Sequence, residues 1–271
     1  MKNTLKSFTL YVRSDENSRQ IADKIRHSNS NLSNPLEESD DGDLIIAIGG
    51  DGTFIDSVTN MKFSKNKVFT GVHTGTLGFL QDFSPEDIYT LMNYIRHEKE
   101  LRVRKVFTSL TKVFFLDGNT MEFHSLNDLV LAGRNYSKIT FSEHIDGEFL
   151  QKISGNGIII STSTGDTAFN LNANGAIDFS NNFQLVCTPI TPIQNAAYER
   201  FITNSIICTK IDIVLESSKN IQIIIDGKPQ NIDSESIESV EVSMHKENYI
   251  QKLDYFNYSK TGVIRKKILG Y

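Results

Sequence analysis

The chain has 271 residues, 39% of them hydrophobic and 23% charged, which is typical of a globular protein of one large or two ordinary domains and excludes a disordered or fibrous chain. Lysine and arginine total 28 against 33 acidic residues, and the formal net charge of -5 argues against a broad basic surface for nucleic acid or anionic lipid. No apolar run approaches the roughly 18 residues of a membrane-spanning helix, so we expect no membrane and no nucleic-acid partner.

Short apolar runs alternate with helical patterns over the first hundred residues, which predicts a parallel sheet with crossover helices. We expect a polar loop over 28–43, and the capping residues Ser14 or Asp15 and Ser84 precede the two expected helices. Residues 44–48 are apolar throughout, as in a central strand buried on both faces. The predicted elements are strands at 8–12, 44–48 and 68–72, and helices from about 15 to 27 and from 85 to about 98.

After residue 98 the pattern becomes alternating, and three Asp-Gly pairs lie between strand-like runs as hairpin turn signals. These pairs are Asp117-Gly118, Asp146-Gly147 and Asp226-Gly227. We expect 111–116 to pair with 120–124, 139–145 with 148–153, and 221–225 with 237–242. The second part is therefore predicted to be an antiparallel sandwich or layered sheet, with a domain boundary near residue 100.

The cysteines and the basic cluster give little direct evidence of function. Cys187 and Cys208 lack the spacing of a zinc site, and one disulfide would be sparse for a secreted chain. Because no apolar leader follows Met1, we expect a reduced, cytoplasmic protein. The cluster Arg265-Lys266-Lys267 is interpreted as a solvated tail.

The most informative stretch is Gly49-Gly50-Asp51-Gly52-Thr53, which follows the central apolar strand directly. Glycines at this exit let the backbone approach a ligand, and free N–H groups at a helix start favour phosphate. Asp51 would repel phosphate unless it accepts a proton or binds a metal ion. The alternative is a tight turn in which Asp51 only caps the helix. No P-loop and no dinucleotide-type G-x-G-x-x-G motif is present, which disfavours a dehydrogenase.

Three further polar regions extend this candidate site. A second glycine loop, 71–79, follows the next parallel strand, and neighbouring strand ends of this kind bind ligands in open α/β sheets. His73 in that loop is interpreted as a packed or solvated side chain. Residues 154–170 combine glycines with hydroxyl groups suited to ribose and phosphate, although an ordinary Ser/Thr turn is the alternative. Asn127-Asp128 is a polar pair in an apolar strand and needs partners there.

Taken together, these four motifs resemble the bacterial ATP-dependent NAD kinases over most of the chain. The matching motifs are Gly49-Gly50-Asp51-Gly52-Thr53, the loop from His73 to Leu80, the Asn127-Asp128 pair, and the stretch from Ser161 to Asn170. The resemblance implies a Rossmann-like α/β domain over 1–100, to which 255–271 returns, and a mostly β dinucleotide-binding domain over 101–254. It also implies a homodimer or homotetramer.

The implied reaction converts NAD and ATP, with Mg2+ or another divalent cation, into NADP and ADP. Asp51 would be the general base that takes the proton of the adenosine-ribose 2'-hydroxyl, Asn127 and Asp128 would hold the adenylate half, and no residue is assigned to metal. The resemblance implies the following nucleotide-binding residues: Gly49, Gly50, Asp51, Gly52, Thr53, Gly75, Phe79, Asn127, Asp128, Ser154, Asn156, Thr167, Ala168, Phe169, Asn170 and Asn172.

The sequence departs from the family pattern at three expected substrate contacts. Asn156 stands where an aspartate is usual, Ser154 where a basic or polar residue is usual, and Phe169 where a tyrosine is usual. Asn156 and Phe169 motivate one alternative, a non-catalytic NAD(P)-binding sensor. A second alternative is a lipid kinase of the diacylglycerol type, which shares the Gly-Gly-Asp-Gly-Thr motif.

Overall fold

The computed structural model describes residues 1–75, 78–180, 183–193, 205–216 and 220–270. The chain divides into two compact units. The first consists of Met1–Val106 with Tyr249–Tyr271, and the second of Phe107–Asn248. Two long strands, β5 (Val103–Phe115) and β16 (Ile237–Leu253), contribute residues to both.

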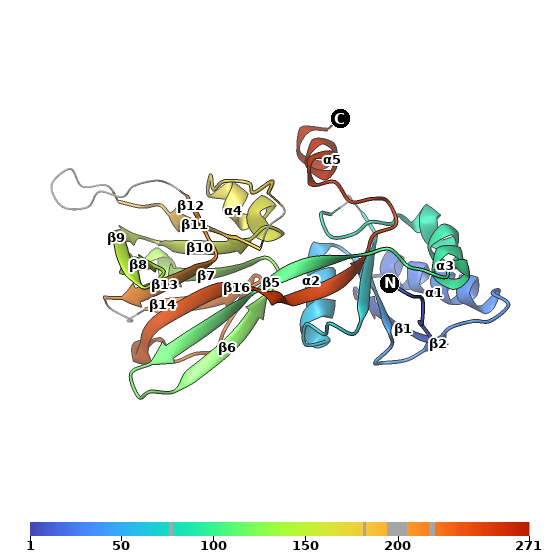
Figure 1. The fold of residues 1–271 in the computed structure, drawn as a ribbon, viewed down its shortest axis with the longest axis horizontal. Coiled ribbons are helices and arrows are strands. Elements are labelled where there is room, and N and C mark those ends of the chain that lie inside the picture. The colour runs from blue at the N-terminus through green and yellow to red at the C-terminus, as the bar shows by residue number, and fades with distance from the viewer. Residues whose placement is uncertain (76–77, 181–182, 194–204, 217–219, 271) are drawn as a thin grey trace. The chain divides into compact units, whose positions relative to one another are not determined.

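The first unit is built on parallel strands in the order β2, β1, β3, β4 and the last residues of β16 (Figure 1). The predicted α/β fold with a parallel sheet and crossover helices is confirmed. Its elements are β1 (Ser7–Val12), α1 (Glu16–Ser30), β2 (Glu37–Glu38), β3 (Leu44–Gly49), α2 (Asp51–Asn60), β4 (Val68–His73), η1 (Pro85–Asp87), α3 (Ile88–His97), α5 (Lys260–Ile264) and the π-helical turn η5 (Arg265–Leu269).

The local signals of the sequence explain these elements. The Asp15 carboxylate accepts the N–H of Ser18 and caps α1, and Ser84 with Asp87 forms a capping box before α3. All six residues of β3 are buried, as a strand between two parallel neighbours requires. The predicted polar loop over 28–43 is shorter than expected, because α1 continues to Ser30 and β2 follows.

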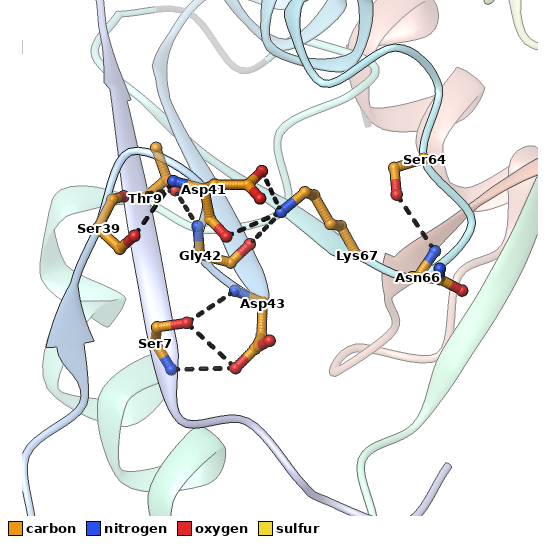
Figure 2. Close-up of polar contacts among 9 residues, drawn as sticks. All are labelled: Ser7, Thr9, Ser39, Asp41, Gly42, Asp43, Ser64, Asn66 and Lys67. Atoms are coloured by element: carbon orange, nitrogen blue, oxygen red, sulfur yellow. Dashed lines mark hydrogen bonds and ion pairs between the residues drawn. The ribbon is translucent and has the colours of Figure 1, made fainter.

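A polar network fixes the loop that enters β3 (Figure 2). Asp43 accepts hydrogen bonds from the N–H and hydroxyl of Ser7, each at 3.1 Å, and the Thr9 hydroxyl accepts the N–H of Gly42 at 2.8 Å. The Lys67 ammonium reaches the Gly42 carbonyl at 2.8 Å and the Asp41 carboxylate at 2.7 Å. These contacts lie at the amino ends of β3 and β4, which pair in parallel from Leu44 with Val68 to Gly49 with His73.

The second unit is mostly β, as predicted. One set of strands is ordered β16, β13, β8, β9, a further pair is β5 and β6, and a separate sheet is ordered β12, β11, β10, β7, β14, β15. Its elements are β6 (Thr120–Ser125), β7 (Asp128–Gly133), η2 (Arg134–Tyr136), β8 (Ile139–Ile145), β9 (Glu148–Gly155), β10 (Gly157–Thr162), η3 (Gly165–Thr167), α4 (Phe169–Asn172), β11 (Leu185–Ile190), β12 (Ile206–Cys208), β13 (Lys210–Leu215), β14 (Ile221–Ile225), β15 (Lys228–Pro229) and η4 (Ser234–Ser236). Residues of both sheets, such as Leu131 of β7 and Ile211 of β13, form one apolar core.

The three Asp-Gly turns are confirmed, but one predicted strand pairing is wrong. The turns join β5 to β6, β8 to β9 and β14 to β15. The expected pairing of 221–225 with 237–242 does not form, since β14 pairs with β7 and β15 while residues 239–243 of β16 pair with β13. The tight turn at Asp226-Gly227 sends the chain into β15 instead, and apolar alternation alone does not specify a strand's partner.

Within the described ranges, no helix is long and apolar enough to cross a membrane. Cys187 and Cys208 are both free thiols, with their sulfur atoms 3.8 Å apart on adjacent strands.

Candidate active site

The first two glycine loops leave neighbouring strands at the same edge of the parallel sheet. The last residue of β3, Gly49, is in register with His73, the last residue of β4. Gly50 then serves as the N-cap of α2, so Asp51, Gly52 and Thr53 form the first helical turn. The carboxyl edge of the sheet and the N-terminus of a 10-residue helix therefore meet at Asp51, an arrangement suited to phosphate.

Asp51 is held by the second glycine loop and does not cap its own helix. The N–H of Phe79 donates to its Oδ2 and the N–H of Leu80 donates to its Oδ1, both at 2.8 Å. The N-cap position makes no side-chain hydrogen bond, so the capping interpretation is wrong. Each carboxylate oxygen keeps a lone pair, and the side chain is only partly buried. The carboxylate is thus fixed in orientation and still able to accept a proton.

The glycines around Asp51 have two different roles. A Cβ at Gly78 would collide with the Asp51 carboxylate and the Gln81 carboxamide, so only glycine lets the loop lie against Asp51. At Gly50, Gly52 and Gly75, by contrast, an added Cβ would meet no atom of the described residues within 4 Å. Packing does not explain these three glycines, which leave backbone open to a ligand.

A buried ion pair lies beside this edge. Lys252 of β16 is fully buried, and its ammonium bonds to the carboxylate of Asp82. Burial lowers the pKa of Lys252 to about 8, against the opposing attraction of Asp82. His73, the last residue of β4, places its Nδ1 2.8 Å from the Gly75 carbonyl oxygen.

In the second unit, Asp226 organises the Asn127-Asp128 segment. Its carboxylate accepts three backbone N–H groups, those of Leu126 at 2.8 Å, Asn127 at 2.7 Å and Asp128 at 3.1 Å. Asp226 has φ 49, the left-handed conformation of its turn with Gly227. Burial raises the pKa of Asp226, and the three hydrogen bonds oppose that shift.

Asn127 presents an unsatisfied polar atom, and Asp128 presents a buried carboxyl group. The Oδ1 of Asn127 is buried without a hydrogen-bond partner among the described residues. Asp128 is 5% exposed, and burial followed by repulsion from Asp226 raises its pKa to about 7. At neutral pH this carboxyl group exists in both protonation states, so it can donate or accept a hydrogen bond. Unsatisfied buried groups of this kind fit a ligand.

The third glycine-rich region follows β10. The Thr162 hydroxyl donates to the Leu126 carbonyl at 2.6 Å, which ties this turn to the Asn127 segment. Thr167 and Ala168 are partly buried, and Phe169 exposes 46% of its surface at the start of α4. An exposed aromatic ring is suited to stacking on a base.

Asn170 and Asn172 differ from each other in this region. Asn170 is fully buried and its amide N–H groups donate to the carbonyls of Asp166 at 3.0 Å and Ala176 at 2.9 Å. Its Oδ1 accepts the Thr188 hydroxyl at 2.7 Å, so the amide is used within the chain and shapes the turn. Asn172 is exposed at the end of α4.

Ser154 lies near the end of β9, and Asn156 is the single residue between β9 and β10. Ser154 is 1% exposed, and its hydroxyl is 2.8 Å from that of Thr140. The Asn156 amide donates to the Tyr136 carbonyl at 2.6 Å, and its Oδ1 accepts the Thr191 hydroxyl. Both side chains already have partners in the chain, so a ligand would compete with them.

The raised pKa of Asp128 predicts a pH-dependent stability. The unfolded carboxyl ionises near 3.8 and the folded one near 7, so between these values the folded state holds the extra proton and stability falls as pH rises. Asp128→Asn has no proton to lose, so its stability does not fall over this range. We expect the difference in the free energy of unfolding, variant minus wild type, to be about 2 kcal/mol larger at pH 8 than at pH 5. Urea unfolding at both values measures it, with the exposed Asp146→Asn as the control. An equal effect at the two values would contradict the prediction.

Several residues of these clusters were not identified from the sequence. Asp226 was interpreted only as a turn residue, and nothing in the Asp-Gly signal shows that its carboxylate points inward. Lys252 could have been noticed, because alternation places it on the same face as the buried Ile250. The basic cluster predicts a solvated tail at Lys267, whereas the structure places Lys267 in the lining of a cavity together with Phe79. Gln81 carries no motif at all.

The described residues contain no group of three or more His, Cys, Asp or Glu side chains that could hold a metal ion. Mg2+ bound mainly by substrate phosphates and water needs no such group.

Comparison with known proteins agrees with the geometry. Residues 6–100 match the ATP-NAD kinase N-terminal domain and residues 126–252 the ATP-NAD kinase C-terminal domain. The NAD kinase of Acetivibrio thermocellus is 32% identical over 217 residues, which are 79% of this chain and 72% of that protein. The NAD kinase of Chlorobium phaeobacteroides is 32% identical over 201 residues, 73% of this chain, and the match spans 64% of that relative's length.

Among solved structures, the crystal structure of yeast NADH kinase complexed with NADH aligns with a TM-score of 0.80. The alignment covers 98% of this chain and 88% of that chain at 20% identity, and it shows a shared fold. Together with the two domain matches and the bacterial relatives, it confirms the resemblance seen in the motifs. The chain belongs to the ATP-NAD kinase family.

Proposed function

We propose that this protein is an NAD kinase, which transfers the γ-phosphoryl group of ATP to the 2'-hydroxyl of the adenosine ribose of NAD. The products are NADP and ADP. The observation that carries the proposal is the Asp51 carboxylate, fixed by two backbone N–H groups at an open, glycine-lined helix start. Membership of the ATP-NAD kinase family supports the substrate pair.

The chemistry needs a base and a site for phosphate, and this edge of the sheet supplies both. Asp51 takes the proton of the 2'-hydroxyl as its oxygen attacks the γ-phosphorus. The N–H groups at the start of α2 and the open backbone at Gly50, Gly52 and Gly75 receive phosphate oxygens. Gly49 and Thr53 shape this turn, because Thr53 packs against Gly49 and its N–H donates to the Gly50 carbonyl. Mg2+ enters with ATP as part of the substrate and offsets phosphate charge.

We propose that the second unit binds NAD. The orphaned Oδ1 of Asn127 and the carboxyl group of Asp128 are suited to amide and hydroxyl groups of the adenylate half. Thr167, Ala168 and the exposed ring of Phe169 supply the adenine surface.

The remaining proposed binding residues have less direct roles. Ser154 and Asn156 already have partners within the chain, and we assign them to the rim of the dinucleotide site. Asn170 supports the turn from within and Asn172 lies on its surface. Asn156 is neutral where the family usually has a negatively charged aspartate. We therefore expect the affinity for an anionic dinucleotide to depend less on salt concentration than it would with aspartate at this position.

We further propose a cytoplasmic homodimer or homotetramer, with domains near 1–100 plus 255–271 and 101–254. The two free thiols, 3.8 Å apart, are typical of a reducing compartment. Light scattering coupled to gel filtration measures the assembly, and a monomer at micromolar concentration would contradict the proposed oligomer.

The deciding assay measures NADP formation by the purified chain from NAD, ATP and Mg2+, through a coupled NADP-specific dehydrogenase. We expect steady NADP production that depends on both substrates. A lipid kinase would phosphorylate diacylglycerol vesicles and give no NADP, and a sensor would bind NADP in calorimetry without turnover. Either result would overturn the proposal.

A further inference from the structure

A cavity of about 540 Å³ opens within the first unit. The loop after β4 forms one wall through Phe79, Gln81 and Asp82. The C-terminal segment forms the other through Tyr258, Lys266 and Lys267. Phe79, whose N–H holds Asp51, therefore also lines this cavity.

Gln81 presents an unsatisfied amide to the cavity. The side chain is 2% exposed, yet neither its Oε1 nor its Nε2 has a hydrogen-bond partner among the residues that the structure describes. A Cβ built on Gly78 would collide with both Gln81 Oε1 and Asp51 Oδ1, so the carboxamide and the carboxylate lie against the same glycine. An unpaired buried carboxamide is destabilising, and a ligand in the cavity that hydrogen-bonds to it would remove that cost.

Lys267 supplies a positive charge to the same cavity. Its ammonium lies 4.8 Å from the centre of the Phe79 ring, and its charge interacts with those of Asp51 and Asp82. Asp82 is already bonded to Lys252, and in the described part of the chain Lys267 makes no ion pair within 4.0 Å. Burial lowers the pKa of Lys267 to about 8, so the ammonium is charged at neutral pH.

From this geometry we infer that Lys267 and Gln81 contact the phosphoryl group in transfer, Lys267 as a catalytic cation and Gln81 as a hydrogen-bond donor. The inference rests on the proposed function. In the step, the ribose 2'-oxygen bonds to the γ-phosphorus, the bond from that phosphorus to the β,γ-bridging oxygen breaks, and ADP leaves. The hydroxyl proton passes to Asp51, and Lys267 keeps its own proton while offsetting the charge on the phosphoryl oxygens.

Substitution of Lys267 tests the inference. We expect Lys267→Met to lower kcat by about 100-fold, because a cation that stabilises the transition state is lost. Lys267→Arg keeps the charge and is expected to recover most of the activity. The matched control is Arg265→Met, which removes one positive charge from the same exposed segment outside the cavity and should keep full activity. Gln81→Met is expected to raise KM for ATP, with calorimetry of tripolyphosphate as the direct binding readout.

A pH profile separates a catalytic cation from a structural one. The charged groups that act on Lys267 are Asp51, Asp82, Lys252 and Lys266, and the cavity wall adds His73, Asp87, Asp254, Tyr255 and Tyr258. We expect kcat/KM of the wild type to fall above about pH 8, and that fall to move to higher pH in Lys267→Arg.

The outcomes distinguish the inference from the proposed function. If the wild type forms NADP and Lys267→Met remains as active as Arg265→Met, the inference is overturned and the kinase stands. If Lys267→Arg fails to restore the activity lost in Lys267→Met, charge at this position is not the cause, and the inference is also overturned. If the wild type forms no NADP at all, the proposed function fails and the inference falls with it.

Discussion

Replacing Asp51 by asparagine is expected to lower kcat by about 1,000-fold, within the range measured for loss of a general base. The amide cannot take the proton of the 2'-hydroxyl. Its nitrogen would also face one of the two backbone N–H groups, of Phe79 or Leu80, that now donate to the carboxylate. The coupled NADP assay at saturating NAD and ATP measures the effect.

The control for this substitution is Asp40→Asn, since Asp40 is exposed and lies before β3, in the loop at the opposite edge of the sheet. Thermal unfolding of both variants shows whether the loop after β4 has been disturbed. A kcat for Asp51→Asn within tenfold of the wild type would refute the role of this residue as base. A drop accompanied by full loss of folding would be resolved by Asp51→Glu, which keeps the carboxylate and restores part of the rate if proton transfer is its role.

Replacing Asp226 by alanine is expected to destabilise the chain by about 3–5 kcal/mol and to weaken dinucleotide binding. Three backbone N–H groups, those of Leu126, Asn127 and Asp128, lose their acceptor together. Each orphaned group costs about 1–3 kcal/mol, and partial access of water reduces the sum. Because Asn127 and Asp128 lose the carboxylate that holds their backbone, binding of NAD should weaken at least tenfold.

Asp146→Ala is the matched control for this substitution. Asp146 also begins an Asp-Gly hairpin turn, with φ 53 against φ 49 at Asp226, but it is exposed and accepts no backbone N–H from the described chain. Both variants therefore pay a similar cost of about 1 kcal/mol for alanine at positive φ. Urea unfolding gives the difference between them, and calorimetry gives the affinity for NAD. Equal destabilisation in the two would show that the three hydrogen bonds carry no net stability.

The contrast between Asp146 and Asp226 shows that a local sequence signal predicts a turn but does not predict the partners of its carboxylate. Each Asp-Gly pair correctly predicted a turn, because only the conformation of two residues decides it. Whether the carboxylate points to water or to three N–H groups depends on β7, about a hundred residues earlier in the chain. The wrong partner assigned to 221–225 has the same origin, since an alternating apolar strand fits any sheet edge of matching pattern.

The sequence by itself determined the parallel sheet, its capped helices, the hairpins and the glycine-flanked Asp51, because each depends on neighbours a few residues apart. It also contained the motifs that identify the family. The tertiary structure decided which groups surround the reacting positions. Phe79 and Leu80, which donate to Asp51, lie 28 and 29 residues after it in the chain. Lys267, near the other end of the chain, lines the cavity that Phe79 also lines. From the sequence, the basic cluster at 265–267 has the pattern of a solvated tail. In the structure Lys267 is partly buried near Asp51 and Asp82, and this environment arises only because distant segments pack together.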